Sequence, residues 1–392
     1  MSENKKYWDG PALFGEILKS DIVKPWMVLV LGVVAYWCVP MISTMCEGTF
    51  ISESMGNKIQ KYLPVFFDVS ASFKCPKGAL GDGGLTYVKD TSHHLFTICI
   101  SLGAMFACLI VKNVNPALNK MVSDEIFSDQ FSLFRSKVRW FNLLQKKSAF
   151  YMIPAFFSVL SLFFFVDLYK EFTTVNWWGN HHYGVAGLLF SFIIQWMVFF
   201  GVYYVLHIAI SSLMLGRIME IDISLRPFHE DGCNGLEPLG VIVVYFWGFA
   251  ICLAGAVFVA LRFGYLGIED QVFTWLIALL GVLCIPMIAV YPLYKSIQAV
   301  YKYRRYKLAR LDSKISSVLD DLDSGLTGAS DDELVKQTEV FEKLSSVHKV
   351  MYSINMWPFD VKVLVGAILV YFAQAFFILK QVAEKVTDAV GG

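Results

Sequence analysis

Apolar residues gather in seven stretches along this chain, and charged residues lie mainly between them. A helix of about 20 mainly apolar residues is long enough to cross the hydrocarbon core of a bilayer. The pattern therefore predicts an all-α, polytopic membrane helix bundle of about seven spans. The predicted spans are Pro25–Met45, Thr91–Val111, Ser148–Leu168, Gly184–Leu215, Leu239–Arg262, Gln271–Leu293 and Phe359–Leu379.

The domain organisation follows from these spans. Residues 1–24 form an N-terminal segment, and 25–293 hold six spans with a long outer loop at 46–90. Residues 294–356 form a polar part, and 357–392 hold the last span and the C-terminal tail.

Lysine and arginine are distributed unevenly among the connections. They are frequent between the second and third spans and after the sixth, and nearly absent between the third and fourth. Basic residues favour the cytoplasmic side of a membrane. We therefore expect a cytoplasmic N-terminus and an outer C-terminus. The absence of any Asn-x-Ser/Thr sequence fits a bacterial inner membrane.

The polar part at 294–356 has the apolar spacing of two paired helices. Its predicted arms carry 4-3 stripes and are joined by a glycine-containing break at 323–329, which predicts an antiparallel helical hairpin in the cytoplasm. The stripes consist of Ile297, Tyr301, Arg304, Leu308, Leu311, Ile315, Val318 and Leu322, and of Phe341, Leu344, Val347, Met351 and Ile354. They pack within the chain, or they also contact other subunits or a cytoplasmic protein.

Residues 113–147 mix aromatic side chains with basic ones, and the aromatic residues are Phe127, Phe131, Phe134, Trp140 and Phe141. Such a mixture is typical of a segment whose aromatic rings lie among lipid headgroups. Docking on the hairpin is the alternative.

The densest polar motif lies between the fourth and fifth spans. Glu220 and Asp222 lead into the run Arg226-Pro-Phe-His-Glu-Asp-Gly-Cys-Asn-Gly-Leu236. Imidazole, carboxylate and thiolate are all Zn²⁺ ligands, so one interpretation is a metal site at His229, Asp231 and Cys233. Other interpretations are a structured turn, or a hydrolytic site with Glu230 or Asp231 as the base.

This run resembles a His-Pro-Asp-Gly-Cys-Gly-Gly-Leu motif of uncharacterised bacterial multi-span membrane proteins. Glu230 stands in the place of the motif's proline, and Asn234 in the place of one glycine. Trp357-Pro358-Phe359-Asp360 resembles a second element of the same group. The resemblance implies a membrane protein and carries no activity with it.

Two further sites are expected at the outer face. One is a Zn²⁺ or Cu²⁺ site or pH sensor, with the interfacial histidine pairs serving only structural contacts as the alternative. The other is a disulfide between Cys46 and Cys75, or two free thiols. The histidines are His93, His94, His181 and His182.

Composition limits the possible functions. Hydrophobic residues make up 56% of the 392 residues and charged residues 17%, below the roughly 25% of soluble domains. The net formal charge of zero gives no basic field for nucleic acid. Few ionisable groups lie inside the spans, which argues against a carboxylate proton relay.

The function that we expect is an oligomeric ion channel or pore gated through the hairpin. The alternatives are a metal-dependent membrane enzyme using the 226–236 loop, and a non-conducting scaffold or sensor that binds a partner. No cofactor is expected, with Zn²⁺ as the exception in the enzyme alternative. The candidate pore and coupling residues are Ser191, Gln195, His207, Pro286, Pro292, Leu311 and Ile315.

Overall fold

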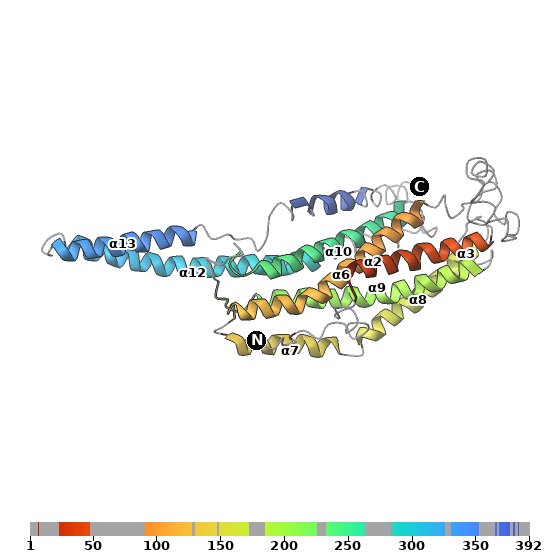
Figure 1. The fold of residues 1–392 in the computed structure, drawn as a ribbon, viewed down its shortest axis with the longest axis horizontal. Helices are drawn as coiled ribbons and strands as arrows, with labels where there is room; N and C mark the ends of the chain where they lie inside the picture. The colour runs from red at the N-terminus through yellow and green to blue at the C-terminus, as the bar shows by residue number, and fades with distance from the viewer. Residues whose placement is uncertain are drawn as a thin grey trace.

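The computed structural model is helical throughout its regular elements (Figure 1). It describes residues 7, 23–47, 91–127, 130–146, 149–171, 185–225, 233–262, 284, 286–325, 331–352, 365–366, 368–376, 379–380 and 383. No strand occurs among these residues, so the all-α prediction is confirmed for them.

The membrane-type helices lie roughly along one common axis (Figure 1). In chain order the bundle elements are α2 (Pro25–Val33), the π-helical turn η1 (Val34–Cys38), α3 (Val39–Glu47), α6 (Thr91–Ser123), α7 (Phe131–Gln145), α8 (Ala149–Glu171), α9 (Val185–Ile218) and α10 (Glu237–Arg262). Then follow α12 (Met287–Gly325) and α13 (Asp331–Tyr352).

Within the described residues, four helical segments are long and apolar enough to cross a membrane. They are Pro25–Thr44, His93–Ser123, Gln195–Ile218 and Glu237–Val259. The predicted spans at 148–168, 271–293 and 359–379 are described only in part. Several apolar helices therefore make this a membrane-type protein, while the full set of seven spans stays a prediction.

Small residues bring the central helices close together. Gly32 of α2 lies so near α6 that an added Cβ would stand 2.7 Å from Ser101 Oγ. Gly255 of α10 would place a Cβ 3.1 Å from Cys99 Sγ, and a Cβ on Gly248 would overlap the Phe106 ring. Glycine at such crossings lets two membrane helices approach closely, where packing is the main source of their association.

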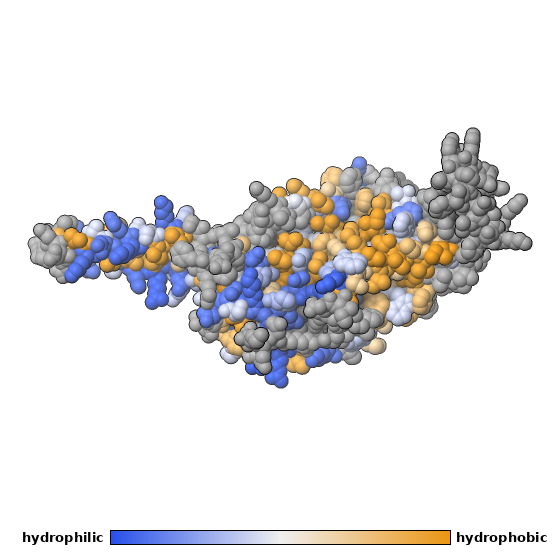
Figure 2. Space-filling view, in the orientation of Figure 1, coloured by the Kyte–Doolittle hydropathy of each residue, from blue (hydrophilic) through white to orange (hydrophobic). Residues whose placement is uncertain are grey.

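Some of these helices are longer than a bilayer core is thick. The 34 residues of α9 span about 51 Å at 1.5 Å per residue, against about 30 Å of hydrocarbon. The predicted fourth span, which had to tilt or extend beyond the interface, is thus one unbroken helix. Figure 2 shows hydrophobic side chains over the bundle and hydrophilic side chains along the projecting α12 and α13.

Helices α12 and α13 form an antiparallel hairpin that extends away from the bundle (Figure 1). The Arg304 guanidinium lies 4.6 Å from the Tyr352 ring centroid, and His348 Nε2 lies 3.1 Å from Asp312 Oδ1. The partly buried positions between the arms are Arg304, Leu308, Leu311, Ile315, Val318 and Leu322 on α12, and Leu334, Gln337, Phe341, Leu344, His348 and Met351 on α13.

We call these positions between the arms the hairpin seam. The seam differs from the predicted stripes at two positions. Val347 is 43% exposed and Tyr301 is 54% exposed, so neither belongs to the contact between the arms. Continuing the alternating spacing of three and four from Phe341 and Leu344 leads to His348. A polar residue therefore occupies the seam position that was assigned to valine.

The expectation that the aromatic rings of residues 113–147 lie among headgroups is wrong for three of the rings and is not tested for the exposed ones. The first part of this segment belongs to α6, and α7 packs against α9 with Phe134, Val138 and Phe141 in the core. Phe127, just before α7, is 1% exposed. Phe127, Phe134 and Phe141 therefore contact the protein interior and not lipid headgroups. Trp140 and Phe131 remain exposed, at 59% and 37%.

Candidate functional site

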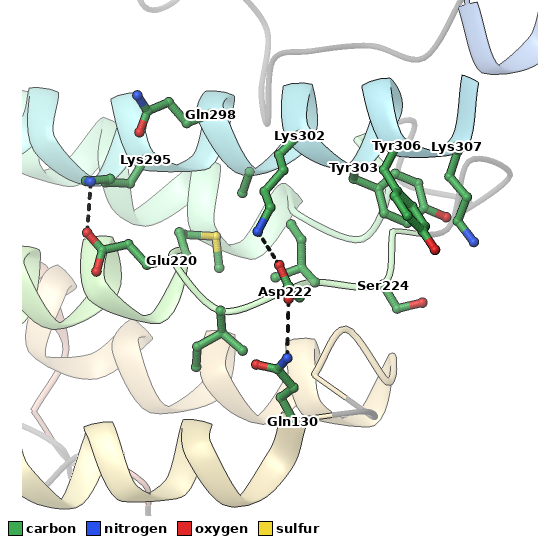
Figure 3. A pocket seen from close by; sticks show the side chains of 14 residues that line it. Gln130, Glu220, Asp222, Ser224, Lys295, Gln298, Lys302, Tyr303, Tyr306 and Lys307 are labelled. Atoms are coloured by element: carbon green, nitrogen blue, oxygen red, sulfur yellow. Dashed lines mark hydrogen bonds and ion pairs between the residues drawn. The ribbon is translucent and has the colours of Figure 1, made fainter. Parts of the chain in front are cut away.

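A short connection after α9 brings acidic side chains to the base of the hairpin. The backbone N–H of Ser224 donates to Ile126 O at 2.8 Å, which fixes this connection against the end of α6. Lys137 of α7 donates from Nζ to Arg217 O at 2.8 Å. The connection is thereby held from two sides, with Glu220 and Asp222 facing α12 (Figure 3).

Both acids form ion pairs with α12. Glu220 Oε1 lies 2.8 Å from Lys295 Nζ, and Glu220 Oε2 lies 3.0 Å from Arg217 Nη1. Asp222 pairs with Lys302 through Oδ1, and its Oδ2 accepts a hydrogen bond from Gln130 Nε2 at 3.3 Å. Lys295 and Lys302 are seven residues apart, two helical turns, so they lie on one side of α12. We call these two pairs the acid–lysine clamp.

The clamp borders a cavity of about 610 Å³ between the connection and α12. Tyr303 lines it and donates from its hydroxyl to Leu225 O at 3.1 Å. Lys307 also lines it, with Nζ 5.4 Å from the centroid of the Tyr303 ring. Gln298, Tyr306 and Ser224 complete its polar lining (Figure 3).

The charges of the clamp support one another. Burial alone would raise the pKa of Glu220, but hydrogen bonds from Lys295 and Arg217 outweigh it and hold that pKa below its usual range. The hydrogen bond from Lys302 lowers the pKa of Asp222. The hydrogen bond to Glu220 raises the pKa of Lys295. Glu220, Asp222 and Lys295 are therefore charged at neutral pH.

The two pairs differ in their access to water. The side chains of Glu220 and Lys295 are 27% and 23% exposed, whereas those of Asp222 and Lys302 are 63% and 73% exposed. Water screens the second pair, and exposed pairs contribute little to stability. The Glu220–Lys295 pair is therefore the firm part of the clamp, and the Asp222–Lys302 pair is the exchangeable part.

Most of the predicted inner-loop site falls outside the described residues. His229 and Asp231 are among these, while Cys233 is described and is half-buried. Asn234 and Gly235 follow at φ of 60° and 87°, so a left-handed turn leads into α10. Among the described side chains no group of three His, Cys, Asp or Glu is arranged for a metal ion. The metal site at this loop therefore stays a prediction.

The predicted outer sites are described in part. His93 is 2% exposed, and His94 Nδ1 accepts a hydrogen bond from Trp37 Nε1 at 2.9 Å. Their rings are 5.8 Å apart between centroids. His181, His182, Cys75 and the side chain of Cys46 lie outside the described residues, so neither the four-histidine site nor the disulfide is tested.

The polar residues predicted to line a pore have contacts within the chain. Gln195 Oε1 of α9 accepts the Ser161 hydroxyl of α8 at 2.8 Å. His207 is 2% exposed and lies between the rings of Phe150 and Tyr203, at centroid distances of 5.3 and 4.5 Å. The side chain of Ser191 is outside the described part.

The two prolines among the candidate pore and coupling residues occupy different places. Pro286 precedes α12, and its carbonyl accepts the N–H groups of Ala289 and Val290 at 2.9 Å. Pro292 lies inside α12, where the Ser296 hydroxyl donates to its carbonyl at 2.5 Å. The helix continues unbroken through Pro292 and reaches Leu311 and Ile315, which are half-buried in the hairpin seam.

Sequence reasoning identified the acids of the clamp but missed their partners. Lys302 is 80 residues from Asp222 in the chain, so no local spacing links them. One signal was present: Lys295 and Lys302 stand a heptad apart in a stretch without acids. Such a stretch needs counter-charges from elsewhere in the fold.

Comparison with family models, with curated proteins and with solved structures finds no match for this chain. Its function is therefore argued from the geometry of the described residues.

Proposed function

We propose that this chain is an integral protein of the cell inner membrane that acts as a sensor or scaffold. Its N-terminus and its α12–α13 hairpin face the cytoplasm, and the hairpin binds a protein partner there. The observation that supports this role best is the acid–lysine clamp, which ties the end of α9 to the α12 helix that leaves the bundle. Through the acid–lysine clamp, a change in the position of the hairpin on partner binding would move α9 in the bundle.

The shape of the hairpin supports an interaction role. The hairpin stands away from the bundle, so both of its arms are accessible to a partner (Figure 1). Its seam contains polar side chains, among them Gln337 and His348. Polar seam positions cost stability and fix the register of paired helices, which suits an arm that has to present one defined surface.

An oligomeric ion channel gated through the hairpin is the second candidate. It is favoured by the continuity of α12, which carries any movement at Leu311 and Ile315 into the bundle. The engagement of Gln195 with Ser161, and of His207 with aromatic rings, disfavours these groups as the lining of a path within one chain. A conducting path would then lie between copies of the chain. The metal-dependent enzyme depends on His229 and Asp231 and gains no support from the described contacts.

Reconstitution of the full chain in lipid vesicles tests these proposals together. A pair of fluorescent labels on Lys343 of α13 and Ser123 of α6 reports the distance between hairpin and bundle. The double variant Glu220→Gln with Asp222→Asn removes both acids of the clamp. We expect a broader distance distribution in this variant, with no flux of K⁺ or Cl⁻ in either protein.

The outcomes separate the candidates. Flux in the wild-type protein, altered by the double variant, would establish the channel and refute the non-conducting role. An unchanged distance distribution would show that the clamp does not join the hairpin to the bundle. The matched control is Glu342→Gln with Asp320→Asn, which removes two exposed acids of the hairpin outside the clamp.

A further inference from the structure

The cavity beside the clamp has more positive than negative groups in its lining. Lys295, Lys302 and Lys307 reach it from α12, and Glu220 and Asp222 reach it from the connection after α9 (Figure 3). Three ammonium groups thus face two carboxylates. The hydroxyl of Tyr306 also lines the cavity, whereas the amide of Gln298 donates to the Tyr294 hydroxyl at 2.6 Å.

The surroundings of the cavity strengthen this excess. Between residues 294 and 311 the chain has six lysines and arginines and no Asp or Glu. A concentration of one charge around a concave surface raises the local concentration of ions of the opposite charge. The cavity is therefore suited to an anion.

The exposed half of the clamp can exchange its partner. Asp222 and Lys302 are both more than 60% exposed, so an entering anion reaches them without unfolding. A phosphate group carries several acceptor oxygens, and its charge-assisted hydrogen bonds are among the strong ones in proteins. It could take Lys302 from Asp222, and Lys307, five residues further along α12, lines the same cavity.

The cavity also lies at a particular depth. The part of its lining that comes from the connection after α9 begins at Met219, directly after the apolar segment Gln195–Ile218, and the next apolar segment begins at Glu237. The headgroups of a bilayer lie where apolar segments end. We infer that the cavity binds the phosphate group of an anionic phospholipid, held by Lys302 and Lys307, and that Asp222 competes with it. Soluble phosphate shares this chemistry and is the alternative source.

Lipid retention by the full-length protein tests this site. The protein is equilibrated in nanodiscs of phosphatidylcholine containing phosphatidylglycerol as the probe, and native mass spectrometry measures the retained phosphatidylglycerol. Lys302→Gln with Lys307→Gln should weaken retention about tenfold, as expected for lost charge-assisted hydrogen bonds. Asp222→Asn should strengthen it several-fold, because the competing carboxylate is gone.

The control removes the same charge elsewhere. Lys314→Gln with Lys336→Gln alters two exposed hairpin lysines and should leave retention unchanged. Equal loss in this control, or unchanged retention in Asp222→Asn, would overturn the proposal. Competition by inorganic phosphate identifies the source: displacement only at large excess assigns the lipid, and displacement at equal concentration assigns soluble phosphate to the same site. This experiment measures lipid binding, so its result tests the lipid site independently of the proposed coupling role of the clamp.

Discussion

Arg304 lies with its guanidinium 4.6 Å from the centroid of the Tyr352 ring, and this contact closes the hairpin at the end nearest the bundle. A cation over an aromatic face contributes about 0.5–1 kcal/mol at an exposed site. Arg304→Lys keeps the charge but loses the planar stacking of the guanidinium. We expect faster hydrogen exchange in the last turn of α13 in this variant. Arg305→Lys, on an exposed neighbouring position, is the control and should leave exchange unchanged.

The hairpin seam should be sensitive to charge at two half-buried positions. Leu311→Asp with Ile315→Asp would place carboxylates between the arms, where burial without partners is costly. We expect α13 to separate from α12 while the bundle still inserts, measured as a longer distance between two fluorescent labels, one placed on each arm. Ser313→Asp with Ser316→Asp adds the same charge on exposed positions of the same helix. If the arms separate equally in both variants, the seam is not what holds them.

The crossing of α6 and α10 should not tolerate a methyl group at Gly248. An added Cβ there overlaps the Phe106 ring, and overpacking of this kind costs about 1–3 kcal/mol. Gly248→Ala should therefore lower the thermal stability of the detergent-solubilised protein. Gly201→Ala is the matched control, since a Cβ at Gly201 meets nothing within 4 Å and alanine favours a helix over glycine. A stable Gly248→Ala protein would contradict the close crossing.

The clamp should open in acid. The folded pKa values of Glu220 and Asp222 lie below their usual values, so the clamp's contribution is present above about pH 4 and is lost as the pH falls through the folded values. Hydrogen exchange of the connection after α9 should rise in that range. The variant Glu220→Gln with Asp222→Asn should exchange fast at every pH. A pH-independent wild type would show that these pairs do not hold the connection.

His207 should be replaceable by an aromatic residue. It is 2% exposed among aromatic rings, and its ring nitrogens have no hydrogen-bond partner among the described side chains. Phenylalanine of similar shape removes buried polar atoms, so we expect His207→Phe to keep or raise thermal stability. His207→Asp, which buries a charge, should lower it strongly. A marked loss of stability in His207→Phe would point to a polar role for this residue.

The sequence predicted those features that depend on local pattern. The helix at Val185–Ile218 follows from an apolar run, and the seam residues Leu311 and Ile315 follow from heptad spacing. Features that depend on distant contacts were missed. Phe134 was expected among headgroups because the apolar end of α9 that buries it is far away in the chain. His348 was missed in the seam because a hydrophobic neighbour, Val347, fitted the expected residue type better.

The clamp illustrates the same limit at the candidate site. The sequence shows that Glu220 and Asp222 follow an apolar span, but the residues next to them in the chain do not specify whether they bind a metal, water or lysine. Only the approach of α12 decides this, and that approach is set by packing such as Gly216 against Tyr291, where no space remains for a Cβ. Chemistry that arises from helix packing is therefore not readable from the polar residues themselves.

Because α12 is one unbroken helix, a small tilt at its base produces a large displacement at its far end. From Lys295 to Gly325 the helix rises about 45 Å at 1.5 Å per residue. A tilt of about 5° at the clamp would displace the far end of the hairpin by about 4 Å, more than the length of one hydrogen bond. Conversely, a partner that holds the tip acts on a long lever arm and needs little force to turn α12 within the bundle.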